Sequence, residues 1–297
     1  SIDHPEMPKI ELRFQDLSGL NFEYVNLSNS DFRWSNFDTA TKISDVNFTN
    51  ANLSHADLSD HNLTGTILAG ADLTDANLTG VDLSGKDLTG TILAGVDLSG
   101  KDFTGTILAG ADISNANLTG VDLSGKDLTG TRLVGVDLSG KDLTGTILAR
   151  ADLSNSILTG VDLSGKDLTG TILTGADLTD VNLTGVDLSG KDFTGTILTG
   201  ADLSDANLSN AILINVNLEN ATLENAKLLD VNLYRANLTN ADLKNTLLID
   251  ANLTNAILTG SDLSNAVLTG AILIDANLEN VILTNAILNC VGHPVCV

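Results

Sequence analysis

Residues 51–75 read ANLSHADLSDHNLTGTILAGADLTD, and this stretch contains the pattern that decides the fold. Every fifth position, here Leu53 to Leu73, is a large apolar residue, and we call this position the centre. The centres continue as Leu, Ile or Phe from Ile43 to Leu288. An earlier run from Leu12 to Phe37 has the same period one residue out of phase, which places a register slip at 38–42.

The other four positions of the repeat are also restricted. The residue two before the centre, which we call the slot, is mostly Ala, Val or Thr, and the residue directly before the centre is mostly Asp or Asn. Ser or Thr usually follows the centre, and Gly, Asn or Asp comes next. A period of five fits neither a helix nor a flat strand. It fits a short strand and a turn, because Gly, Asn and Asp tolerate the positive φ of a type II turn.

The motif A(D/N)LXX, as in Ala51–His55 and Ala71–Asp75, resembles that of the pentapeptide-repeat family over nearly the whole chain. The resemblance implies an all-β fold, a right-handed quadrilateral parallel β-helix with four pentapeptides per coil. We expect about fourteen coils, with centre and slot side chains facing inward. The expected organisation is an N-terminal cap segment at 1–12, the β-helix at 12–289 with its slip at 38–42, and a C-terminal tail at 290–297.

The composition agrees with a narrow core and an acidic surface. Hydrophobic residues make up 42% of the chain but aromatic residues only 3%, and the formal net charge is −23. This charge argues against direct binding to nucleic acid or insertion at an anionic membrane, since both attract Lys and Arg. No apolar run approaches the length of a membrane span.

Four-sided stacking predicts one outward acidic column. A solvated acidic face, weak cation binding and mimicry of DNA phosphates are all compatible with such a column. Its expected members are Asp82, Asp102, Asp122, Asp142 and Asp162.

A longer unit close to VDLSGKDLTGT recurs six times and places lysines in slots. Burying an ammonium group without a partner costs free energy, so two arrangements of these lysine side chains remain open. The lysines either bend to the corner and neutralise neighbouring Asp columns, or lie buried on Thr hydroxyls and backbone carbonyls. The six residues are Lys86, Lys101, Lys126, Lys141, Lys166 and Lys191.

No motif in the sequence indicates an enzyme, a metal or a cofactor. The stretch G-x-x-x-x-G-K at Gly80–Lys86 imitates a phosphate-binding loop, but Asp87 follows where that loop requires Ser or Thr. The four histidines do not cluster in sequence, and the Ser and Asp residues are repeat positions. We therefore expect no catalytic, metal or cofactor residues.

The two ends raise separate expectations. The aromatic residues of the first coils predict a capping core under 1–12. Cys290 and Cys296 could close a disulfide loop over the last coil, which would favour an exported protein, whereas two reduced thiols would fit the cytosol. An exposed C-terminal coil invites end-to-end homodimerisation, which the family resemblance also implies.

These features favour a rigid, non-enzymatic structural or interaction scaffold that binds another protein or itself. The alternative, implied by the family resemblance, is a DNA mimic that binds DNA gyrase or topoisomerase. The sequence does not identify the partner.

Overall fold

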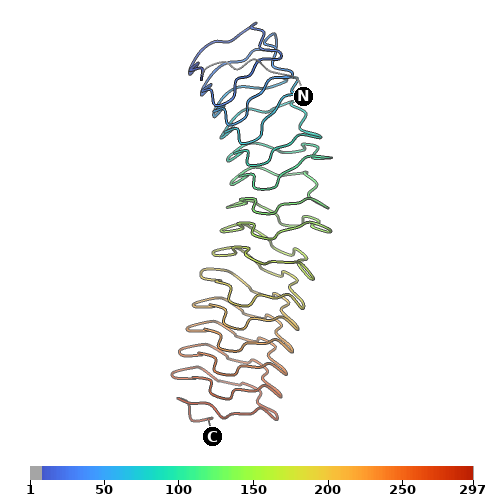
Figure 1. Ribbon diagram of the computed structural model, residues 1–297. Helices are drawn as coiled ribbons and strands as arrows, with labels where there is room; N and C mark the ends of the chain where they lie inside the picture. Colours follow the sequence, from blue (N-terminus) through green and yellow to red (C-terminus); the bar gives the residue numbers. More distant parts are fainter. Residues whose placement is uncertain (1–8, 297) are drawn as a thin grey trace. The chain divides into compact units, whose positions relative to one another are not determined.

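The computed structural model describes residues 9–296, and the chain folds as a right-handed quadrilateral β-helix. Figure 1 shows how the backbone winds in successive coils. Contacts divide the chain into two compact units, Ser1–Val136 with Thr144–Ala151, and Asp137–Leu143 with Asp152–Val297. Both units are built from coils of the same kind. Within 9–296 the strands are isolated parallel bridges, and no helix is present.

The second unit shows how one coil stacks on the next. Four consecutive repeats each pair with a later repeat, as in Asp202 with Thr222 and Asn207 with Lys227. Paired residues therefore lie four pentapeptides apart, which means that each coil has four sides with one pentapeptide on each. Each bridge carries backbone hydrogen bonds, such as Leu203 N to Thr222 O at 2.7 Å and Thr222 N to Ala201 O at 2.9 Å. The peptide groups are thus satisfied between coils rather than within one.

Turns at the corners close each side of the square. Ala206 N donates to Leu203 O at 3.1 Å, and Asp205 between them has a φ of +59°. This geometry is the type II turn that the Gly, Asn and Asp positions predict, and it recurs along the chain. Arg150 and Arg235, which depart from the consensus, also have positive φ. The backbone therefore adopts the same positive-φ turn whichever residue occupies the corner.

Centres and slots form the core, as the pattern predicts. Nearly all centres from Leu17 to Leu273 are buried, as are the Ala, Val and Thr residues of the slots. Most slot threonines donate their hydroxyl to a carbonyl of the preceding coil, as Thr106 Oγ1 does to Leu83 O at 2.8 Å, whereas Thr246 donates to Leu243 O of its own coil. Burial of a Leu side chain contributes roughly 1.5–3 kcal/mol, so the stacked centres supply most of the driving force for folding.

The aromatic residues of the first described coils occupy two kinds of position. Phe32, Phe37 and Phe48 are buried centres, but Phe14 and Trp34 occupy corners and are largely exposed. The rings of Phe14 and Trp34 stack with a centroid separation of 6.4 Å. The expected cap at 1–12 lies mostly outside the described residues.

The register slip changes the spacing between paired residues. Asp16 pairs with Asn36, which is four pentapeptides later, whereas Asn21 pairs with Lys42, which is one residue further on. The hydroxyl of Thr41 donates to Leu17 O at 3.0 Å and to Asp38 Oδ1 at 2.9 Å within the extra segment. The additional residue is therefore absorbed at a corner, and the coils on either side keep their stacking.

Candidate interaction face and inter-coil crevices

Where an Asp or Asn precedes the centre, its side chain stabilises the turn that follows. Its Oδ1 accepts a hydrogen bond from the backbone N–H two residues later, as in Ser204 N to Asp202 Oδ1 at 3.0 Å and Ser84 N to Asp82 Oδ1 at 2.9 Å. This Asx arrangement fixes the start of the turn. The side chain therefore stays at the surface with one oxygen engaged and the other directed to solvent or neighbours.

All five predicted acidic residues are exposed at the surface. Neighbouring members are separated by four pentapeptides, which is one coil. Asp82 and Asp102 lie on the same side of successive coils in the first unit, and Asp142 and Asp162 do so in the second. Hydrogen bonds from Ser84 lower the pKa of Asp82, and hydrogen bonds from Thr104 lower that of Asp102. The charge of Asp82 acts in the opposite direction on the pKa of Asp102, as expected for two like charges on neighbouring coils.

The lowered carboxyl pKa values predict loss of stability in acid. Hydrogen bonds from Ser99, Ser139 and Ser189 lower the pKa of Asp97, Asp137 and Asp187, respectively. A depressed folded pKa contributes stability that is complete above the unfolded value, about 3.9, and is lost as pH falls through the folded value. We expect the urea midpoint to fall as pH drops below about 4. The variant Asp97→Asn, which keeps an acceptor but cannot titrate, should show a weaker pH dependence; an unchanged slope would contradict the assignment.

All six repeat lysines are half-buried, and five of them donate from the ammonium group to backbone carbonyls of the preceding coil. Lys101 Nζ donates to Leu78 O at 2.7 Å and Val81 O at 2.8 Å, and Lys191 Nζ to Leu168 O at 2.6 Å. Lys86 donates to Leu63 O and Lys126 to Phe103 O. Of the two arrangements left open by the sequence, carbonyl bonding is the direct contact of Lys86, Lys101 and Lys191, and nearby aspartates act on these three through their charge.

Burial lowers the pKa of three of these lysines. Desolvation is the main cause for Lys86, Lys101 and Lys191, and nearby aspartates partly oppose it, with Asp82 acting on both Lys86 and Lys101. These three lysines therefore lie at the boundary between the core, which desolvates them, and the acidic surface, whose charge stabilises them.

A threonine can replace a slot lysine if carbonyl bonding is its main task. In the slots one coil before and after Lys126, Thr106 and Thr146 donate to Leu83 O and Leu123 O at 2.8 and 3.0 Å. We expect Lys126→Thr to change the unfolding free energy by less than about 1 kcal/mol, because a hydrogen bond is retained. Lys126→Ala should cost about 0.5–1.5 kcal/mol more, since the Phe103 carbonyl then lacks this donor. Equal urea midpoints for the two variants would show that the bond is unimportant.

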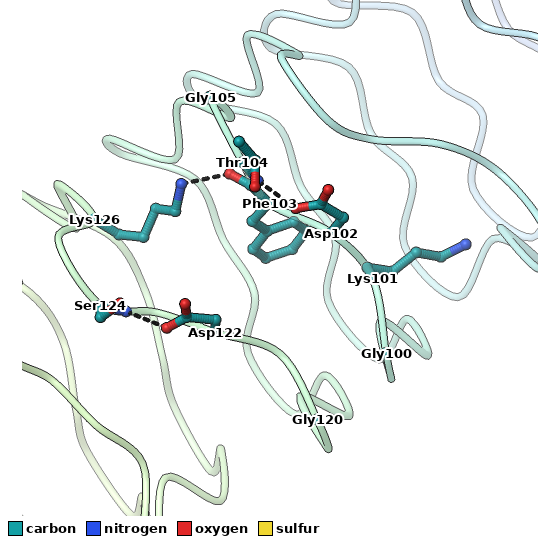
Figure 2. Close-up of a pocket in the computed structure, with 10 residues that line it drawn as sticks. All are labelled: Gly100, Lys101, Asp102, Phe103, Thr104, Gly105, Gly120, Asp122, Ser124 and Lys126. Carbon is teal, nitrogen blue, oxygen red and sulfur yellow. Dashed lines mark hydrogen bonds between the residues drawn. The ribbon is translucent and has the colours of Figure 1, made fainter.

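A crevice opens between two coils on the acidic side of the first unit (Figure 2). It has a volume of about 410 Å³ and runs between the segment at 100–105 and the segment at 120–126. Asp102 and Asp122 line it, and Lys126 reaches across it to Phe103 O. A second crevice, of about 320 Å³, lies between 60–65 and 80–86, with Lys86 reaching across to Leu63 O. The lining positions of the two crevices correspond one to one at a spacing of two coils.

The C-terminal end combines a disulfide with a partly open core. Cys290 and Cys296 are joined, with their Cα atoms 4.9 Å apart. Val291 pairs with Ile272 through Leu273 N to Val291 O and Val291 N to Ala271 O, both at 2.9 Å. The last centres, Leu278, Leu283 and Leu288, are only half-buried. The final coil therefore leaves apolar surface at its end.

Within the described residues, no cluster of three or more His, Cys, Asp or Glu is arranged to hold a metal ion. Among residues 9–296 there is also no helix with the length and apolarity that a membrane span requires. The features that stand out chemically are an exposed acidic column, the crevices beside it and the open C-terminal edge.

These features define a β-helical repeat protein with a regular, exposed surface. Pentapeptide repeats match in overlapping segments that together cover nearly all of residues 11–285. The chain therefore belongs to the pentapeptide-repeat family. Proteins of this family are generally structural or interaction proteins.

Two solved structures illustrate the relationship. HetL, a pentapeptide repeat protein involved in heterocyst differentiation regulation from the cyanobacterium Nostoc sp. strain PCC 7120, is 26% identical, and the match covers 95% of this chain and 92% of HetL, with a TM-score of 0.17. QnrB1, a plasmid-mediated fluoroquinolone resistance protein, is 17% identical, with 93% and 91% covered and a TM-score of 0.25. Comparison with curated proteins found no significant match.

Proposed function

We propose that this protein is a non-enzymatic interaction scaffold whose acidic side binds a protein partner. The observation that carries the proposal is the column of exposed aspartates, repeated once per coil on a stacked backbone. Regular spacing on a stacked frame gives a preorganised array of negative charge. Such an array attracts a partner with a complementary positive surface and speeds its association.

The Asx hydrogen bonds support this proposal. Each engaged Oδ1 restricts the rotation of its Asp side chain. Binding of a partner therefore costs less side-chain entropy on this surface. The same bonds keep the pKa of Asp82 and Asp102 low, so the carboxylates stay charged well below neutral pH.

Charge-matched variants test the proposal. One variant carries Asp82→Asn, Asp102→Asn and Asp122→Asn, and its control carries Asp57→Asn, Asp97→Asn and Asp137→Asn at the same repeat position on another side. Asparagine can keep the Asx hydrogen bond in every case. Partners captured from the source cells by the unaltered protein should be lost with the first variant and kept with the control. Equal retention by both variants would remove the acidic side as the binding surface.

A second candidate is a DNA mimic acting on DNA gyrase or topoisomerase. It is favoured by the acidic column and by the family resemblance, which includes proteins of that activity. A supercoiling assay decides between the two: inhibition or protection of gyrase at micromolar protein supports mimicry, and no effect removes it.

We also propose that the C-terminal end joins two copies of the chain. The support is the half-buried state of Leu278, Leu283 and Leu288, since an apolar end gains by being covered. Sedimentation should give a dimer for the unaltered protein and a monomer for Leu283→Glu with an unchanged circular-dichroism spectrum. A monomeric unaltered protein would contradict the proposal.

A further inference from the structure

Opposite sides of the first unit are bonded unequally between coils. On one side, which we call the closed side, bridges run without a gap through Asp72, Ile92, Asp112 and Arg132. On the opposite side, two repeats away in each coil, Asn62, Asp82 and Asp102 take part in no β-bridge. We call this second side, which carries the acidic column, the open side.

Backbone donors show the same contrast at equivalent positions. On the closed side, Leu73 N donates to Ile92 O at 2.7 Å, Leu93 N to Asp112 O at 2.6 Å and Ile113 N to Arg132 O at 2.9 Å. On the open side, within the described chain, the amides of Leu63, Leu83 and Phe103 have no backbone acceptor. All six residues are buried centres, so burial of the side chain does not explain the difference.

Lysine contacts partly replace the missing bridges. Lys86, Lys101 and Lys126 each donate to carbonyls of the preceding coil. A single flexible side chain restrains two coils less than a ladder of backbone bonds does, because its ammonium can exchange a carbonyl for water. The corner remains attached through Gly85 N to Thr104 O at 2.8 Å. Both crevices lie on this more weakly held side.

The charges favour separation on the open side and attachment on the closed side. Asp82 and Asp102 follow each other on the open side, and the charge of Asp82 makes ionisation of Asp102 less favourable. On the closed side, Ile92 separates Asp72 from Asp112, and Asp112 is paired with Arg132 at 2.6 Å. Repulsion between exposed charges is screened by salt over about 10 Å at 0.1 M and about 3 Å at 1 M.

We propose that the coils of the first unit pivot about the closed side, so that the crevices of the open side widen at low ionic strength and narrow when the Asp column is neutralised. The closed side acts as the hinge because its ladder is complete. The open side responds to charge because lysine and threonine contacts and single corner bonds, rather than a continuous ladder of bridges, oppose the repulsion. This inference concerns the coils themselves and stands whether or not the acidic side binds a protein.

Amide hydrogen exchange resolved by residue tests the proposal on the unaltered chain. At 10 mM NaCl, the amides of Leu63, Leu83 and Phe103 should exchange at least about tenfold faster than those of Leu73, Leu93 and Ile113, which serve as internal controls. In 1 M NaCl, exchange of the first set should slow by about fivefold relative to the second. Equal exchange of both sets at low salt would overturn the proposal, and so would a fast first set that ignores salt.

Variants separate charge from a permanently loose ladder. Asp82→Asn with Asp102→Asn should slow exchange of the Leu83 amide at 10 mM NaCl, as salt does. Asp57→Asn with Asp97→Asn removes the same charge from a different side and should leave that amide unchanged. An equal effect of both pairs would show that only net charge matters and would overturn the side-specific hinge.

Discussion

Replacing Leu158 by alanine is expected to lower the free energy of unfolding by about 2–5 kcal/mol. Leu158 is a fully buried centre of the second unit, and its amide donates to Asp177 O at 2.7 Å. The loss combines the transfer free energy of the missing carbons with the cavity that remains. A stacked coil relaxes little, since its backbone is bonded to neighbours on both sides. Urea unfolding followed by circular dichroism measures the effect.

The residue directly before Leu158 supplies the control. Ile157 is 40% exposed and points away from the core, although it belongs to the same repeat. Ile157→Ala should change the unfolding free energy by no more than about 0.5 kcal/mol. If the two alanine variants were equally stable, the assignment of inward and outward positions would be wrong.

Gly85→Val is expected to cost about 1–2 kcal/mol, because valine would have to adopt the left-handed conformation at this corner. Gly85 has a φ of +66°, and no atom lies within 4 Å of the place where a Cβ would stand. The cost therefore reports backbone conformation rather than a collision. The hydrogen bond from the backbone amide of residue 85 to Thr104 O must also be kept in the strained corner. The same urea measurement applies.

Asparagine at the same position separates conformation from size. Asn occupies many corners of this chain with φ near +58°, among them Asn220 and Asn240. Gly85→Asn should therefore cost clearly less than Gly85→Val. A valine variant as stable as the asparagine variant would mean that the corner does not require positive φ in solution.

The periodicity predicted a chain that turns once in every repeat, because it encodes two independent requirements. Centres such as Leu203 must face inward, and corners such as Asp205 must adopt positive φ, and both recur once in every repeat. Only a chain that turns once per repeat meets both requirements. The family resemblance added the handedness and the number of sides.

The surface was less predictable, since side-chain bonding depends on neighbours that sequence spacing does not resolve. The hydrogen bond from Ser84 N to Asp82 shows that the Asp position is a turn former as well as a surface charge. The signal was available in the recurring Asp-Leu-Ser order. Missing bridges at Asn62 and Asp82 left no comparable signal, because the same residue types pair normally elsewhere, as Asn52 does with Asp72.

The spacing of four repeats between bridged residues has a consequence for how such a gene can change. The near-identical segments 81–120 and 121–160 are substrates for unequal recombination, which would insert or delete a copy of this two-coil segment. Such an event adds or removes whole coils and leaves every downstream residue on its original side. Insertion of a single pentapeptide would instead rotate all downstream residues by a quarter turn and split the acidic column between two sides. An acidic column that binds a partner, as proposed above, would therefore tolerate length changes in multiples of a coil and lose its continuity with the others.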